Sequence, residues 1–153
     1  MLPYLEINAV RYSQIINQSY QFFFKQYLVQ PVTDIHELSS LLYHSPFVVL
    51  AHDGGVDPVF IYANQKAQDL WGYSWTEFLR LPSRLSAALD QQQDRNRFLA
   101  EVAEHGYSSE YSGIRVDKNG RSFRIENVAL WNLKDEKTGL KGQAACFSNW
   151  AYL

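Results

Sequence analysis

The sequence predicts an α+β fold, an antiparallel sheet of about five strands with helices on one face and extra helices at the N-terminus. Three observations support this class. The first third of the chain has helical periodicity, and short β-branched and aromatic runs follow it. Residues 58–79 encode a strand, an Asn turn and two capped helices. The C-terminal part alternates apolar and polar residues around the turn signal Asn119-Gly120.

Two helices are expected at the N-terminus. The first runs from about Asn8 to Leu28 and is amphipathic, so its apolar face needs a partner. The second begins after a cap at Thr33 or Asp34. One side of this second helix is apolar, formed by Ile35, Leu38, Leu41 and Leu42.

The central unit contains the strongest local signals. The strand Val59–Tyr62 leads to Asn64, which is expected to cap the following helix. Gly72 is placed to take the left-handed conformation that ends this helix. Ser74 and Glu77 then form a capping box for the next helix.

An irregular segment at Pro82 is followed by a helix that begins near Gln91 and ends at His105 and Gly106. Its buried stripe is predicted to be Phe98, Leu99 and Val102.

Three long antiparallel strands are expected at the C-terminus. Tyr111–Val116 pairs with a strand starting at Phe123 through a two-residue Asn119-Gly120 hairpin. The apolar residues of the second strand change parity, which predicts a bulge near Glu126 or Asn127. The final strand is Gln143–Trp150, and one of its faces is expected to line the interior.

Composition fits one globular domain, with residues 1–44 as an N-terminal helical extension packed on a core of residues 45–153. Of the 153 residues, 46% are hydrophobic and 20% charged, and the net charge is −2. No basic stripe or long apolar run is present, so we predict neither nucleic-acid binding nor a membrane association. A single cysteine, Cys146, and the lack of a signal segment predict a cytoplasmic protein.

The Asn64 turn and the run Gly72-Tyr73-Ser74-x-x-Glu77 resemble the second strand and following helices of PAS domains. Five further segments, in consistent order, resemble the MEKHLA domain, a PAS-related module. They are Pro46-Phe47-Val48-Val49-Leu50-Ala51-His52, Asp57-Pro58-Val59-Phe60-x-Tyr62-Ala63-Asn64, Leu81-Pro82-Ser83-Arg84-x-Ser86-Ala87, Tyr111-Ser112-Gly113-Ile114-Arg115 and Gly142-Gln143-Ala144-Ala145-x-Phe147. The resemblance covers roughly residues 10–150.

This resemblance implies a PAS-like fold. The MEKHLA domain is known as the tail of plant homeodomain-zipper transcription factors and as a free-standing bacterial protein, and the chain resembles the stand-alone form because no output domain is expected. The N-terminal helices of PAS-like proteins often mediate dimerisation. Covering the sheet within the same chain is the alternative.

No catalytic constellation is predicted, and we expect a protein that is not an enzyme. His52, Asp53 and Asp57 are better explained by a turn between two strands than by a metal site. Cys146 has no neighbour in sequence that would lower its pKa, so a buried, inert thiol is expected. No metal site is predicted.

No cofactor can be named from the sequence. Flavin-binding PAS light sensors carry Asn-Cys-Arg-Phe-Leu-Gln where this chain has the segment 81–86, Leu-Pro-Ser-Arg-Leu-Ser, which argues against blue-light chemistry. Some PAS proteins ligate haem through a histidine on the helix that contains His105, but the helix dipole explains His105 more simply.

Aromatic residues make up 15% of the chain. They either fill the core or line a cavity for a small apolar or planar ligand. The candidate pocket residues are Tyr62, Asn64, Trp71, Trp75, Arg84, Trp131, Gln143 and Phe147. The leading hypothesis is a sensory or interaction module that binds such a ligand and signals through protein association. The alternative is a ligand-free scaffold with a filled aromatic core that forms a homodimer or binds another protein.

Overall fold

The computed structural model describes residues 2–153. Short 3-10 turns lie at Pro3–Leu5, Ser83–Ser86 and Leu89–Gln91. The helices are α1 (Ile7–Phe24), α2 (Ile35–Tyr43), α3 (Gln65–Trp71), α4 (Trp75–Phe78) and α5 (Gln92–His105). The strands are β1 (Val48–His52), β2 (Phe60–Ala63), β3 (Tyr107–Val116), β4 (Ser122–Asn132), β5 (Gln143–Phe147) and β6 (Asn149–Tyr152).

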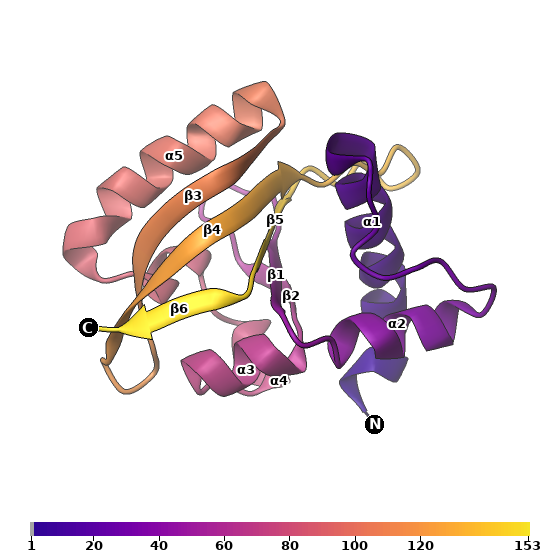
Figure 1. Cartoon of the computed structure of the whole chain (residues 1–153), viewed down its shortest axis with the longest axis horizontal. Helices are drawn as coiled ribbons and strands as arrows, with labels where there is room; N and C mark the ends of the chain where they lie inside the picture. The colour runs from indigo at the N-terminus through magenta and orange to yellow at the C-terminus, as the bar shows by residue number, and fades with distance from the viewer. Residues whose placement is uncertain (1) are drawn as a thin grey trace.

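The six strands form one antiparallel sheet, which confirms the predicted fold class (Figure 1). The order is β2-β1-β5-β4-β3, and β6 also pairs with β4. β4 meets β6 over Phe123–Glu126 and β5 over Ala129–Asn132. The single strand expected at 143–150 is therefore divided at Ser148, because its two halves pair with different parts of β4.

Helices cover both faces of the sheet, with α5 on one side and α1 and α2 on the other (Figure 1). The α5-side core contains Trp71, Phe123 and Phe147, and the α1-side core contains Ile16 and Trp131. Alternate residues of β5 thus face different cores, whereas only one interior face was expected. None of the helices within residues 2–153 combines the length and hydrophobicity that a bilayer span requires.

The central unit forms as its capping signals predict. Asn64 Oδ1 accepts a hydrogen bond from Ala67 N at 3.1 Å and so caps α3. Gly72 ends that helix with φ of 81°. The Ser74 and Glu77 capping box is complete at the start of α4, with distances of 3.0 and 3.2 Å. The capping contacts that the local sequence predicts are thus all present.

The N-terminal helices differ from prediction only at one end. Asp34 caps α2 by accepting from His36 N at 2.8 Å. α1 stops at Phe24 instead of Leu28, because Lys25 adopts a left-handed conformation with φ of 63°. The apolar residues beyond Phe24 thus belong to the connection between α1 and α2.

The β3–β4 hairpin has a three-residue loop instead of the expected two-residue turn. Asp117 N donates to Arg121 O at 3.0 Å, and only Gly120 in this loop has a positive φ. A two-residue type I′ turn would require positive φ at Asn119 as well. The predicted bulge is present at Asn127, whose φ is 52°, where the register with β3 shifts.

Candidate functional site

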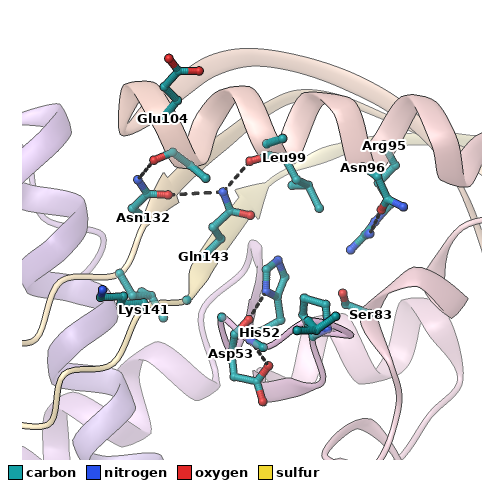
Figure 2. A pocket seen from close by; sticks show the side chains of 18 of the residues that line it. His52, Asp53, Ser83, Arg95, Asn96, Leu99, Glu104, Asn132, Lys141 and Gln143 are labelled. Carbon is teal, nitrogen blue, oxygen red and sulfur yellow. Dashed lines mark hydrogen bonds between the residues drawn. The ribbon is translucent and has the colours of Figure 1, made fainter.

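An open groove of about 940 Å³ lies between α5 and the loop that joins β1 to β2 (Figure 2). The loop 52–58 forms one wall, and Leu99, Ala100 and Ala103 of α5 form the other. Phe23 of α1 closes one side. The volume is that of sites that hold small organic ligands.

The floor of the groove depends on two glycines at which backbones approach closely. A Cβ at Gly54 would overlap the Lys141 carbonyl, and a Cβ at Gly142 would overlap the His52 carbonyl. The β1–β2 loop is therefore held directly against the segment that precedes β5. Larger residues at either position would push these two segments apart.

A small cavity of about 40 Å³ lies behind the groove, inside the α5-side core. His52, Arg95, Leu99 and Gln143 line both spaces and so form the partition between them. A water molecule occupies about 30 Å³ in the liquid. The cavity has room for a polar head group or a water, whereas the groove has room for a larger body.

Two arginines reach this region without an acidic partner. Arg95 projects from α5 toward the groove and is only 6% exposed, and Arg115 of β3 is 7% exposed (Figure 2 shows Arg95). Within residues 2–153 neither guanidinium forms an ion pair. Burial, together with the nearby charge of Arg115, lowers the pKa of Arg95 to about 10. Two buried cations that line the same cavity favour the binding of an anion there.

His52 contributes a second buried polar atom. Its Nδ1 lies 2.7 Å from the Asp53 carbonyl oxygen, which can only accept, so Nδ1 carries the proton and Nε2 faces inward as an acceptor. Nε2 is buried and makes no hydrogen bond of normal geometry within the described chain, although the Gln143 side chain lies close enough to raise the pKa of the ring. Ser83 Oγ at the groove wall is also buried without a partner in the described chain. Burial lowers the pKa of His52, which keeps the ring neutral near neutral pH.

The acidic residues of the loop serve the turn, as the sequence predicts. Asp53 Oδ1 accepts from Gly55 N at 3.2 Å and Val59 N at 3.1 Å, and Asp57 pairs with Arg84 at 3.1 Å. Within residues 2–153 no cluster of three or more His, Cys, Asp or Glu residues is arranged for a metal ion.

The thiol of Cys146 was expected to be buried and is half-buried in the structure. Burial raises its pKa to about 12. Since the thiolate is the reactive form, this side chain is inert at neutral pH.

The structure separates the eight predicted pocket residues into groups. Trp71, Gln143 and Phe147 line the interior cavity, and Arg84 and Gln143 line the groove. Gln143 Nε2 donates to Leu99 O at 2.8 Å, which ties β5 to α5.

The remaining four lie elsewhere. Tyr62, Trp75 and Trp131 belong to the α1-side core, across the sheet from the groove, and each has a buried polar atom without a partner in the described chain. Asn64 is fully buried, and its side-chain amide is hydrogen-bonded to backbone groups. Ligand contact by any of the eight stays a prediction.

Arg95 and Arg115 were missed, although the sequence contains a signal for each. Arg95 occupies the same helical stripe as Phe98, Leu99 and Val102, so a charge stands at a core-facing position. Arg115 has the same strand parity as Tyr111, which is buried. Charged residues at buried positions are typical of functional sites.

The comparison with protein families decides the identity of the domain. The model of the MEKHLA domain matches residues 10–152, which is nearly the whole chain. The chain belongs to the MEKHLA domain family. This confirms the resemblance seen in the sequence.

Plant proteins contain similar MEKHLA regions. The chain is 29% identical over 147 residues to the homeobox-leucine zipper protein HOX29 of Oryza sativa subsp. japonica, a match that covers 90% of this chain and 16% of that protein. It is 24% identical over 148 residues to HOX10 of Oryza sativa subsp. indica, covering 95% of this chain and 17% of that protein. The chain thus spans about a sixth of the length of these relatives.

Solved structures show that this MEKHLA domain has a PAS-type fold. A light-oxygen-voltage domain studied with a flavin analogue matches with a TM-score of 0.58 at 16% identity, covering 76% of this chain and 84% of that one. A PAS domain from a two-component sensor histidine kinase gives a TM-score of 0.58 at 13% identity, with 74% and 91% covered. An RNA-binding light-oxygen-voltage receptor gives 0.64 at 15% identity, with 79% and 35% covered.

Proposed function

We propose that this MEKHLA domain is a sensory module that binds a small ligand in the groove beside α5 and signals by associating with another protein. The observation that carries the proposal is the groove itself, a space of about 940 Å³ that is lined by buried polar groups without partners. Ligand sites in proteins combine such a volume with a few convergent polar groups. The PAS-type fold and the sensor proteins among its structural neighbours support a sensory and non-catalytic role.

A second function, that of a ligand-free association scaffold, is favoured by a different observation. The α5-side core is densely packed with aromatic rings, such as Trp71 against Phe123 at 5.1 Å, and the cavity beside them is small. At the same time apolar side chains of the N-terminal segments are exposed, with Ile7 at 79% and Leu41 at 44%. Exposed apolar groups of this kind suit a homodimer or a protein partner.

Nucleic acid is not part of either proposal. One structural neighbour is named as an RNA-binding receptor. The present chain has a net charge of −2, and its interspersed charges do not offer the cationic surface that a phosphate backbone requires.

Native mass spectrometry of the freshly purified chain tests both functions at once. The sensor proposal expects a discrete added mass in the wild-type protein. Ala100→Trp places an indole in the groove from an exposed position of α5, and this variant should lose that mass. Glu101→Trp, also exposed on α5 but outside the groove lining, is the matched control and should retain it.

The other outcomes separate the two functions. A dimer without added mass in all three proteins would favour the scaffold. An added mass that persists in Ala100→Trp would place the ligand outside the groove and contradict the proposed site.

A further inference from the structure

The Arg95 and Arg115 side chains leave most of their hydrogen-bonding capacity unused inside the protein. Arg95 Nη1 donates to Asn96 Oδ1 at 3.2 Å. Arg115 donates to Tyr111 Oη at 2.9 Å and to Ile114 O at 3.0 Å. Each guanidinium has five N–H donors, and these are the hydrogen bonds that the two groups make within residues 2–153. Both side chains line the interior cavity.

The surroundings of Arg115 hold its side chain in place. Phe98 of α5 stacks on Tyr111 with ring centroids 4.2 Å apart, and Tyr111 in turn bonds Arg115. Gly113 lies between the two on the same face of β3, and a Cβ there would overlap both the Tyr111 hydroxyl and the Arg115 guanidinium. The absence of a side chain at this position provides the room in which Arg115 turns inward.

Burying two cations side by side without an anion opposes folding. Long arginine side chains at a surface would normally extend to water. Here both remain more than nine-tenths buried and reach a cavity that adjoins an open groove. A bound anion would stabilise this arrangement. The anion would supply the missing negative charge and accept hydrogen bonds from several N–H groups at once.

We propose that the ligand is a small organic acid whose carboxylate lies between the guanidiniums of Arg95 and Arg115 and whose body extends into the groove along α5. This inference rests on the proposed ligand-binding function and names the chemical class of the ligand. The planar carboxylate matches the fork of a guanidinium.

The dimensions of the site favour a carboxylate over a phosphate. The cavity beside the two guanidiniums has a volume of about 40 Å³, which suits a flat carboxylate better than a tetrahedral phosphate. Its other walls include Phe60, Ile125 and Val128, and a dianion loses more hydration free energy than a monoanion in such apolar surroundings.

The lining of the groove indicates the chemistry expected for the rest of the ligand. Leu99, Ala100 and Phe23 offer an apolar surface for the body of the acid. The inward Nε2 of His52 is an acceptor at the boundary between cavity and groove, so it selects a hydroxyl or N–H group close to the carboxylate. The predicted ligand is thus an acid with an apolar body and one hydrogen-bond donor near its head.

The test compares three probes that share a phenyl body and differ in the head group, on the dialysed full chain at fixed ionic strength. Benzoate, its neutral isostere benzamide, and phenyl phosphate are titrated while amide chemical shifts are followed by NMR. Benzoate should bind at least about 10-fold more tightly than benzamide, because charge-assisted hydrogen bonds contribute on the order of 1.5–3 kcal/mol. The shifts should concentrate around Arg95 and Arg115.

Variants then assign the effect to the two arginines. Arg95→Met and Arg115→Met should each weaken benzoate binding by about 10-fold or more. Arg95→Lys, which keeps the charge but lacks the planar fork, should be intermediate. Arg97→Met is the matched control, since Arg97 lies on the same helix, is largely exposed and pairs with Asp94 at 3.8 Å. It should bind benzoate as the wild type does.

Each contrary result has a distinct meaning. Equal binding of benzoate and benzamide, blocked in both cases by Ala100→Trp, would retain the ligand-binding groove but overturn the carboxylate assignment. Preference for phenyl phosphate with the same dependence on Arg95 would replace carboxylate by phosphate. No response to benzoate at about 10 mM would also overturn the proposal, and native mass spectrometry would still decide independently whether the groove holds a ligand.

Discussion

Asn64 connects three segments of the chain through one buried side chain. Its Oδ1 accepts from Val49 N of β1 at 3.0 Å and from Ala67 N of α3 at 3.1 Å. Its Nδ2 lies 2.8 Å from the Phe47 carbonyl and 3.1 Å from Ser45 Oγ. Since these contacts occupy both ends of the amide, the main role of Asn64 in the structure is to join α2, β1 and α3.

We expect Asn64→Ala to destabilise the protein by about 3 kcal/mol. Loss of the helix cap contributes roughly 1 kcal/mol, and the unsatisfied amide of buried Val49 adds about 1–3 kcal/mol. Urea unfolding followed by tryptophan fluorescence measures the change. Ser74→Ala, which removes an exposed cap, should lose only about 1 kcal/mol. Equal losses in the two variants would show that the contacts of Asn64 beyond its cap contribute nothing.

At the scale of elements, the β3–β4 hairpin holds the α3–α4 unit against the sheet. Lys118 N donates to Trp71 O at the end of α3 at 2.9 Å, and Lys118 Nζ pairs with Glu77 of α4 at 2.8 Å. The hydrogen bond to Lys118 and those within the capping box with Ser74 lower the pKa of Glu77 to about 2. The Glu77 carboxylate thus bonds both the start of its own helix and the distant β3–β4 hairpin.

The stabilisation by ionised Glu77 should depend on pH in a defined direction. Because its pKa is lower in the folded chain than the ordinary 4.5, the contribution is complete above about pH 4.5 and is lost as the pH falls toward 2. Glu77→Gln keeps a capping side chain but removes the charge. Its Tm should lie below that of the wild type at pH 7, and the two should converge at low pH.

Glu101→Gln is the matched control for this experiment. It removes an exposed carboxylate that forms no ion pair within residues 2–153. Its difference from the wild type should be small at both pH values. A Glu77→Gln difference that stays constant down to pH 2 would contradict the role of the ion pair.

Elements whose causes are local could be predicted from the sequence. The Asn64 cap, the Gly72 terminus and the Ser74 box each depend on residues within one turn, and the bulge at Asn127 followed from the parity of its own strand. The end of α1 could not be predicted, because Lys25 takes the left-handed conformation without the glycine that usually indicates it.

At the scale of the molecule, α1 covers a face of the sheet that would otherwise be open. Ile16 is fully buried, and Tyr20 and Phe24 pack on Trp131 with ring centroids 5.0 and 5.9 Å apart. The face opposite α5 is therefore apolar as well. This burial makes the N-terminal helices part of one core with the sheet.

We expect Ile16→Ala to lower the free energy of unfolding by about 2–4 kcal/mol, because it leaves a cavity between α1 and the sheet. Ile7→Ala changes the same residue type on the same helix at a position that is 79% exposed, and it should be nearly neutral. Chemical denaturation should show a single transition in both variants. If Ile16→Ala unfolds α1 separately while the tryptophan signal of the sheet is unchanged, the helix is an independent extension.

The candidate site could be predicted only in part, because the packing of the whole molecule decides which residues meet there. Gln143, Trp71 and Phe147 were predicted because aromatic side chains with a polar anchor suggest a ligand cavity, and these three do line the interior cavity. Tyr62 and Trp131 lie on the other face of the sheet, and alternation along a strand does not reveal which face meets which helix when both are covered. Trp75 of α4 packs against Tyr62 on that same side. The approach of Arg95 to Arg115 arises from long-range packing of α5 on β3, and no local pattern encodes it.

The wall that Phe23 contributes to the groove has a thermodynamic consequence. Phe23 belongs to α1, and its ring also packs on Gly106 at the end of α5, while Ser19 of the same helix accepts a hydrogen bond from Lys134 N at 2.9 Å on the groove side. If the groove binds a ligand as proposed, its occupancy and the docking of α1 would be linked equilibria. The coupling between the two would be reciprocal. If docking of α1 increases the affinity for the ligand by some factor, the bound ligand increases the equilibrium constant for docking by the same factor. Proteins that bind α1 would then act as competitors or effectors of the ligand without touching it.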